Sequence, residues 1–295
     1  MSEHDQLAER FESHRSHLRA VAYRMLGSLA EADDAVQDAW LRLSRSELAE
    51  IQNLAAWLTT VVARVCLNIL RTRKAHPEQS TGVHMPDPIV RRAGTAPTPE
   101  EEALQSDSVG LAMLVVLDTL GPAERLSFVL HDMFAVPFDD IAPIVGRSTT
   151  ATRQLASRAR RRVHEAAPPP DADAARQREI VDAFYAASRD GDFEALVSLL
   201  DPDVVLRADG GTGMPALSMI LRGAHTIASQ ASMWQRFVPH VWPATINGMP
   251  GVVVAPQGKT MSVMSFTIVA GKVATIDVLA DPERIAALGL GEWEA

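Results

Sequence analysis

Two proline-rich stretches divide this chain and limit what it can fold into. Five prolines fall between about His76 and Glu101, and three more follow one another within Ala167–Ala174. Proline lacks a backbone donor and fixes φ, so neither stretch continues a helix or a central strand. The sequence therefore predicts three folded segments, at residues 5–76, 107–165 and 175–288, with a linker at 77–106.

The first segment has the apolar spacing of helices. We expect one helix from about Ala30 to Leu43 and a longer one from Leu54 to Leu70. The outer face of the first helix is mostly acidic but includes one leucine: Asp34, Gln37, Asp38 and Leu41. The outer face of the second is basic and polar: Arg64, Asn68 and Arg71.

The second segment ends in a helix-turn-helix pattern. The run FDDIAPIVGRSTTATRQLASRARRRVH predicts a short helix ending at Gly146, a tight turn, Ser148 as N-cap, and a second helix. Helical spacing turns Ala151, Leu155 and Ala159 of the second helix inward. Its outer face then holds polar and basic residues: Thr150, Arg153, Gln154, Ser157 and Arg161, with Arg158 and Arg160 beside them.

The third segment changes structural class. A helix begins near Ile180, GDFEALVSLLDPDV gives a turn and a shorter helix, and strand patterns follow. The runs MSVMSFTIV and VATIDVLA, joined by AGK, predict a hairpin. Helices followed by antiparallel strands indicate an α+β domain.

Charge is distributed unevenly along the chain. The formal net charge is −9, which argues against a surface that binds nucleic acid all over. Six arginines nevertheless stand between Gly146 and Glu165, beside one acid. A basic stripe within an acidic protein indicates one DNA-facing element and other surfaces for other partners.

Cysteine content and hydropathy limit the remaining classes. Cys66 is the single cysteine, so an internal disulfide is excluded, and no Cys and His cluster has metal-ligand spacing. We therefore expect no cofactor and no metal. The charged N-terminus and the lack of a long uninterrupted apolar run predict a cytoplasmic protein that does not enter a membrane.

The helical segments resemble a known family. YRMLGSLAEADDAVQDAWLRL resembles the polymerase-binding helix pair of sigma factors, and NLAAWLTTVVARVCLNILRTRKAH resembles their promoter-melting helices. FDDIAPIVGRSTTATRQLASRARRRV looks like the helix-turn-helix that reads the −35 element. Together these segments resemble the group IV (ECF) sigma factors, and their shared order makes the match specific.

The resemblance implies a protein that binds core RNA polymerase and directs promoter-specific transcription initiation. It assigns polymerase docking to Asp34, Gln37, Asp38 and Leu41. Contacts to the single-stranded −10 element fall to Arg64, Asn68 and Arg71, with a base pocket near Ser46–Asn53. On the recognition helix, Arg153 and Gln154 would reach base edges, and phosphates would be met by Arg158, Arg160 and Arg161, beside Thr150 and Ser157.

The third segment is similar to the SnoaL-like extension of one branch of that group. Motifs of the WLPEP, DGGGK and NPDKL types recur there, and they stand here as HMPDP (His84–Pro88), DGGTG (Asp209–Gly213) and DPERI (Asp281–Ile285), without the tryptophan and the lysine. The implied fold is two all-α sigma domains followed by an α+β SnoaL-like, NTF2-like cone domain. We expect the motifs to meet in space as a regulatory contact made by Pro86, Asp87, Pro88, Asp209, Gly210, Gly211, Asp281 and Pro282.

The function of the SnoaL-like segment has two interpretations. Related folds include enzymes, and the acid–base candidates here are Asp209, Asp277, His225 and His240. Alternatively, Asp209 caps the DGGTG turn, the histidines lie on the surface, and the domain binds a small molecule or clamps the sigma domains. We favour the non-enzymatic interpretation because a fold alone does not imply an activity.

Overall fold

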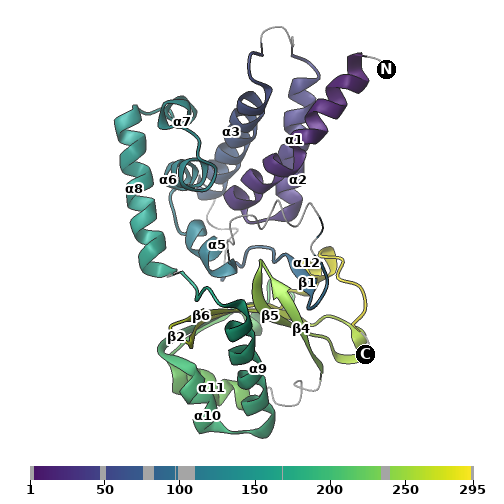
Figure 1. Cartoon of the computed structure of the whole chain (residues 1–295), viewed down its shortest axis with the longest axis vertical. Helices are drawn as coiled ribbons and strands as arrows, with labels where there is room; N and C mark the ends of the chain where they lie inside the picture. The colour runs from purple at the N-terminus through teal and green to yellow at the C-terminus, as the bar shows by residue number, and fades with distance from the viewer. Residues whose placement is uncertain are drawn as a thin grey trace. The chain divides into compact units, whose positions relative to one another are not determined.

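The computed structural model describes residues 3–46, 51–75, 83–96, 98, 110–167, 169–233 and 240–293. The chain divides into two units, and helices with regularly spaced apolar residues make up the first. This unit consists of Met1–Gln79, Pro97–Asp107 and Val116–Ala166. Its elements are α1 (Glu3–Leu26), α2 (Leu29–Leu43), α3 (Leu54–Ala75), the end of α5 (Leu111–Asp118), α6 (Pro122–Phe128), the π-helical turn η3 (Val129–Met133), α7 (Phe138–Val145) and α8 (Thr149–Ala166) (Figure 1).

The two helical segments form one unit, whereas the sequence suggested separate domains at 5–76 and 107–165. Helix α3 packs on α6 and α7. Arg125 of α6 is buried and donates from Nε and Nη2 to the carbonyl of Arg24, at 3.2 and 3.1 Å. Asp118 forms an ion pair with the same guanidinium. These oxygens compensate the hydration that the buried cation loses.

Helix α3 forms the centre of the helical core. Asn53 caps its start, accepting at Oδ1 from the backbone N–H of Ala56 at 3.1 Å. Within the described residues, it is the one helix long and apolar enough by composition to cross a membrane, but half of that stretch is buried. A core helix of a soluble protein has the same composition, and the packing of α3 against α1 and α2 accounts for it here.

The second unit contains the sheet and consists of Ser80–Ala96, Ser108–Val115 and Ala167–Ala295. Its helices are α9 (Ala174–Asp190), α10 (Phe193–Leu199), α11 (Ala224–Met233) and α12 (Pro282–Ala287). Its strands are β1 (Val90–Arg92), β2 (Leu200–Asp209), β3 (Met219–Arg222), β4 (Val241–Ile246), β5 (Met249–Val254), β6 (Ser262–Val269) and β7 (Lys272–Leu279). The sheet order is β1-β4-β5-β6-β7-β2-β3, and among these pairs β2 and β7 run parallel while the others are antiparallel.

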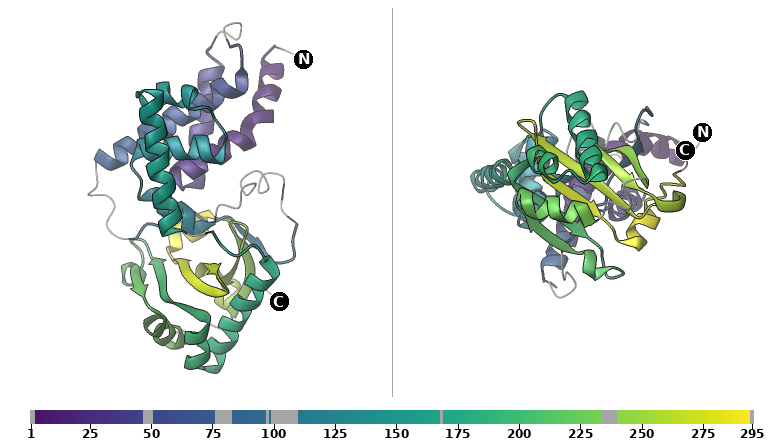
Figure 2. Two further views of the ribbon diagram at one scale, coloured as in Figure 1. Left: turned by 60° about the vertical axis from the view of Figure 1, so that its left-hand side comes forward. Right: turned by 90° about the horizontal axis from the view of Figure 1, so that it is seen from below.

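Helices α9, α10 and α11 cover one face of this sheet (Figures 1 and 2). They bury Phe184, Leu196 and Ile227 against Phe266 and Ile276 of the strands. The α+β class predicted from the sequence is confirmed, because helices are layered on a mostly antiparallel sheet. The predicted hairpin is β6–β7.

The linker expected at 77–106 contributes a strand to the sheet. Strand β1 pairs antiparallel with β4, and Val90 lies opposite Ile246. Both prolines of the HMPDP motif precede β1, so its N–H groups remain able to pair. Val90 also packs against a cluster of buried residues that includes Trp293. The linker interpretation was therefore wrong for residues 83–92, which belong to the second unit.

Candidate functional site

Helix α8 begins where the sequence predicts it. Gly146 adopts a left-handed conformation (φ 71°) that ends α7, and Ser148 Oγ accepts from the backbone N–H of Ala151 at 3.2 Å. The residues expected on the outer face are all exposed: Thr150, Arg153, Gln154, Ser157, Arg158 and Arg161. The helix-turn-helix therefore presents one continuous polar and basic face.

The inward face of α8 differs from the prediction. Its buried residues are Thr152, Ala156, Ala159 and Val163, whereas Ala151 and Leu155 are half-buried. The Thr152 hydroxyl donates to the carbonyl of Ser148 at 3.0 Å, which lets this polar residue enter the core. The buried stripe is thus shifted by one residue at Ala151 and Leu155, while Ala159 is buried as predicted.

The arginines of α8 have different partners. Arg158 and Arg162 pair with Glu124 at 3.1 and 3.3 Å. Arg160 pairs with Asp132 at 2.5 Å. By contrast, the Arg153 guanidinium lies 5.7 Å from the centre of the Phe138 ring. The helix thus carries three arginines paired with acids, and others directed outward.

A second basic face lies on α3. Arg64, Asn68 and Arg71 are exposed and stand about one helical turn apart along one side. Residues 47–50 of the base pocket expected near Ser46–Asn53 lie outside the described residues, whereas Ser46 and residues 51–53 are described. The sequence therefore identified an aligned polar stripe on the helix.

The acidic face of α2 is largely accessible. Asp34 and Gln37 are exposed, Leu41 is 42% exposed, and the half-buried Asp38 pairs with Arg42 at 2.9 Å. Beside this face, a groove between α1 and α2 is lined by residues that include Gln37, Phe11 and Trp40. An exposed leucine next to carboxylates and an aromatic groove is suited to a protein partner with basic and apolar groups.

The three motifs of the linker and the C-terminal segment come together around Arg284. Its Nη1 donates to Asp209 Oδ2 at 2.8 Å, and its Nε donates to Asp87 Oδ1 at 3.1 Å. Arg284 Nη2 also bonds the carbonyl of Met85, and the Met85 N–H donates to Asp209 Oδ2 at 2.8 Å. We call the side chains of Asp87, Asp209 and Arg284, with the backbone of Met85, the linker lock.

The linker lock is charge-assisted, with Asp209 buried and Asp87 and Arg284 partly buried. The side chains of Arg284, Asp87 and Asp209 are 21%, 15% and 5% exposed. Sequence reasoning included Arg284 in the DPERI motif without assigning it a role. The sequence signal for this role was that DPERI, which was expected to contact two motifs with aspartates, contains one arginine.

Close backbone packing brings DGGTG against DPERI. A Cβ on Gly211, where φ is 59°, would lie 1.9 Å from Asp281 Oδ2, and one on Gly210 would lie 2.1 Å from the Met214 carbonyl oxygen. Asp281 caps α12, accepting from the N–H of Glu283 at 2.9 Å, while Pro282 occupies the first turn. Pro86 and Pro88 are buried on the linker side. These residues fix the position of the helix that carries Arg284.

The two carboxylates among the acid–base candidates already have partners. Asp209 belongs to the linker lock and also accepts from the Gly211 N–H at 2.9 Å, as expected for a turn cap. Asp277 pairs with Arg207 at 2.7 Å, and burial raises its pKa while Arg207 opposes that rise. His225 is exposed and His240 half-buried. None of the four lines the apolar cavity of this unit, as far as the described residues define it.

Comparisons with known proteins identify relatives that match almost the whole chain. Residues 10–76 match the model of sigma-70 region 2. The chain is 36% identical to the ECF RNA polymerase sigma factor SigJ of Mycobacterium tuberculosis, covering 97% of this chain and 95% of that one. It is 32% identical to the probable ECF RNA polymerase sigma factor SigI of the same organism, with 97% of each covered. The crystal structure of SigJ matches with a TM-score of 0.76 at 34% identity, covering 95% of this chain and 98% of that chain.

Proposed function

The chain belongs to the ECF family of RNA polymerase sigma factors and directs promoter-specific transcription, and on that premise we propose which surfaces perform this role and how the second unit controls it. The helical unit docks on core RNA polymerase and contacts promoter DNA. The linker lock controls the access of these surfaces to their partners. The same role implies a cytoplasmic location, where core polymerase works.

Helix α8 reads the −35 element. Recognition helices contact base edges from the N-terminal half, where Thr150, Arg153 and Gln154 are exposed here. Arginine and glutamine match guanine and adenine edges in the major groove, and Arg161, farther along, reaches phosphates. Arg158 pairs with Glu124, so a phosphate must compete for its guanidinium. Exposed ion pairs contribute only about 0–1 kcal/mol, so that competition costs little.

Helix α3 contacts the −10 element. Its exposed Arg64, Asn68 and Arg71 follow one side of the helix, as a backbone-tracking face requires. Cations on this face favour the single strand, and Asn68 adds a donor and an acceptor. Helix α2 presents Asp34, Asp38 and Leu41 to core polymerase. Docking through an acidic surface agrees with the net charge of −9, because a sigma factor reaches DNA within the polymerase complex.

The observation that carries the regulatory proposal is the set of bonds made by Arg284. One guanidinium bridges the linker at Asp87 to the end of β2 at Asp209. Removing one member of a fully buried charge pair costs about 3–5 kcal/mol, because it leaves the other charge uncompensated, and the partial exposure of Arg284 and Asp87 lowers that cost. A change of that size is enough to shift a population between locked and open linkers. The lock is therefore suited to a two-state control of linker geometry.

Transcription with purified core polymerase tests this proposal. The proteins compared are the wild type, Arg284→Met, a truncation lacking residues 281–295, and a truncation from Ala172 onward. Arg176→Met, on the exposed side of α9, is the matched control. We expect the first two variants to change transcription in the same direction. Loss of the whole second unit should give a different activity, because the partner of the linker is then gone. Equal transcription from all five proteins would contradict control by the lock.

The acid–base candidates give no reason to propose a reaction for the second unit, because none lines its cavity among the described residues. Asp209 and Asp277 each have an arginine partner. Turnover of a small molecule that Asp209→Asn abolishes would favour the enzymatic interpretation instead.

A further inference from the structure

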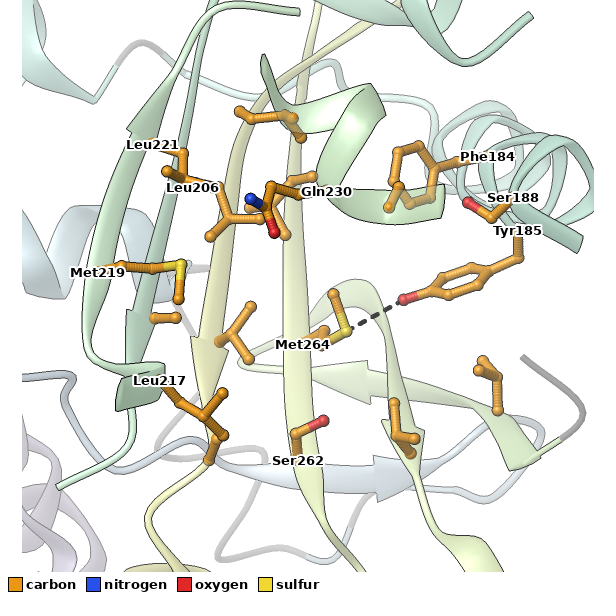
Figure 3. A pocket seen from close by; sticks show the side chains of 18 of the residues that line it. Phe184, Tyr185, Ser188, Leu206, Leu217, Met219, Leu221, Gln230, Ser262 and Met264 are labelled. Carbon is orange, nitrogen blue, oxygen red and sulfur yellow. Dashed lines mark hydrogen bonds between the residues drawn. The ribbon is translucent and has the colours of Figure 1, made fainter. Parts of the chain in front are cut away.

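The second unit contains a partly open cavity of about 160 Å³ between its helices and its sheet (Figure 3). The walls come from α9, α11 and the strands, and they include Phe184, Leu206, Met219, Leu221 and Met264. No Asp, Glu, Lys, Arg or His occurs among the described residues that line it. An ion would therefore lose its hydration without gaining a countercharge.

Four polar side chains line this apolar space: Tyr185, Ser188, Gln230 and Ser262. Ser188 is 3% exposed, and its Oγ has no hydrogen-bond partner among the described residues. The Tyr185 hydroxyl points across the cavity and donates to the Met264 sulfur at 3.3 Å, a weak acceptor (Figure 3). Burial raises the pKa of Tyr185 above its ordinary value, so the phenol stays neutral and able to donate. The Gln230 amide also lines the space.

A buried hydroxyl without a partner is costly, and native structures have few of them. An oxygen placed next to Ser188 would supply the missing bond. An acceptor stronger than a thioether would also improve the bond that Tyr185 donates. The cavity thus contains an unpaired hydroxyl and apolar space that no described side chain fills.

We propose that this cavity binds a small, uncharged ring compound with one carbonyl or hydroxyl oxygen, and that its occupancy is transmitted to the linker lock. A cavity of about 150 Å³ with similar apolar walls accepts benzene, which sets the size of the ring. The aromatic side chains of Phe184 and Tyr185 supply flat apolar contact. The oxygen of the ligand accepts from Ser188 or Tyr185.

The transmission follows from the chain path. Ala208 and Ala280 line the cavity, and the next residues are Asp209 of the lock and Asp281, which caps the helix bearing Arg284. The two ends are joined by a hydrogen bond from the Ala280 N–H to the Asp209 carbonyl at 2.7 Å. A ligand that moves the ends of β2 and β7 therefore moves two sides of the lock. This second part rests on the proposed role of the lock.

Binding is tested on the full-length protein with three probes. Acetophenone has the ring and the oxygen, toluene lacks the oxygen, and benzoate is charged. Ligand-observed NMR should show acetophenone and toluene binding to the wild type, with benzoate at least tenfold weaker. Ala231→Phe fills the cavity from α11 and should abolish binding, whereas Ala183→Phe, on the exposed side of α9, should not. Equal binding to both variants, or no binding of acetophenone to the wild type, would overturn the site.

The polar contact has its own test. Ser188→Ala removes the hydroxyl and should weaken acetophenone by about threefold to tenfold, the range for one neutral hydrogen bond. The affinity for toluene should stay within about twofold, because its contacts are apolar. An equal loss for both probes would indicate a packing effect and contradict the proposed contact.

Coupling between the cavity and the linker lock is measured as a change in the affinity for acetophenone, without polymerase. Linkage requires that a ligand sensed by the lock bind with a different Kd when the lock is broken. We expect the Kd for acetophenone to change at least threefold in Arg284→Met and to remain unchanged in Arg176→Met. Equal Kd values would overturn the transmission. Failure of the lock as a transcriptional control would appear separately, as unchanged transcription by Arg284→Met.

Discussion

Ile89 and Asn247 exchange two hydrogen bonds, although they are 158 residues apart. Asn247 Oδ1 accepts from the Ile89 N–H at 3.0 Å, and the Asn247 N–H donates to the Ile89 carbonyl at 2.9 Å. Asn247 has φ 49°, a conformation that asparagine tolerates better than most residues. Asn247 therefore pairs with the linker directly before β1, in the way that a residue of a neighbouring strand would.

Replacing Asn247 by alanine should loosen the linker. The Ile89 N–H would lose its acceptor in a buried place, at a cost of about 1–3 kcal/mol. We expect faster hydrogen exchange in residues 84–92, measured by mass spectrometry. Gln257→Ala is the control, since Gln257 also has positive φ (54°) but is exposed on the loop after β5. Unchanged exchange in Asn247→Ala would show that the linker is held by other contacts.

Arg153→Ala should weaken −35 recognition by about 1–3 kcal/mol if the side chain contacts a base. Arg158→Ala should have a smaller effect, because its guanidinium already pairs with Glu124. Arg176→Ala serves as a charge control on the second unit. Transcription from the native promoter at several salt concentrations measures the effect. If Arg153→Ala behaves like the control, the DNA-facing side of α8 lies elsewhere.

The double variant Asp34→Lys, Asp38→Lys should reduce assembly with core polymerase. Both residues lie on the outer side of α2, so the charge reversal should leave the helical core intact. Circular dichroism checks the fold, and a pull-down against core enzyme measures binding. Asp182→Lys combined with Asp190→Lys makes the same charge change on the exposed side of α9. Equal retention of the two double variants would remove α2 from the docking surface.

Cys66 should be unreactive until the helical unit unfolds. Burial raises the pKa of its thiol to about 12, so the reactive thiolate is rare near neutral pH. The folded state disfavours the thiolate, so stability is full below the ordinary pKa of the thiol, near 9, and falls as the pH rises toward 12. Labelling with a disulfide reagent at pH 8 should be slow in buffer and complete in denaturant. Rapid labelling of the native protein would contradict this burial.

The sequence predicted elements whose signals are local. The N-cap Ser148 and the left-handed Gly146 are chemical features of one turn, and the β6–β7 hairpin follows from alternation around Ala270 and Gly271. The predicted α8 core was correct at Ala159 but wrong at Ala151 and Leu155, because a hydrogen bond allows Thr152 to be buried instead. Local patterns do not reveal when a polar residue has an internal partner.

Long-range relationships were harder to predict. Nothing near Arg125 in the sequence indicates that it is buried against the carbonyl of Arg24. Prolines predicted that the linker is not helical, which holds for its described residues 83–96, but they did not reveal that Val90–Arg92 finds a partner strand in β4. The three motifs indicated a contact around Asp209, and its central cation emerged only from the three-dimensional arrangement.

The sequence separation within the linker lock sets an order of events during synthesis. Met85 leaves the ribosome 199 residues before Arg284, and at about 5–20 residues per second this interval is about 10–40 s. Helices α1 to α3, whose contacts are close in sequence, complete their packing among themselves well within that time. A nascent chain therefore carries folded α1 to α3, with the docking surface proposed on α2, before any restraint on its linker exists. Ribosome pausing before Arg284 would prolong the interval in which the linker lock is absent.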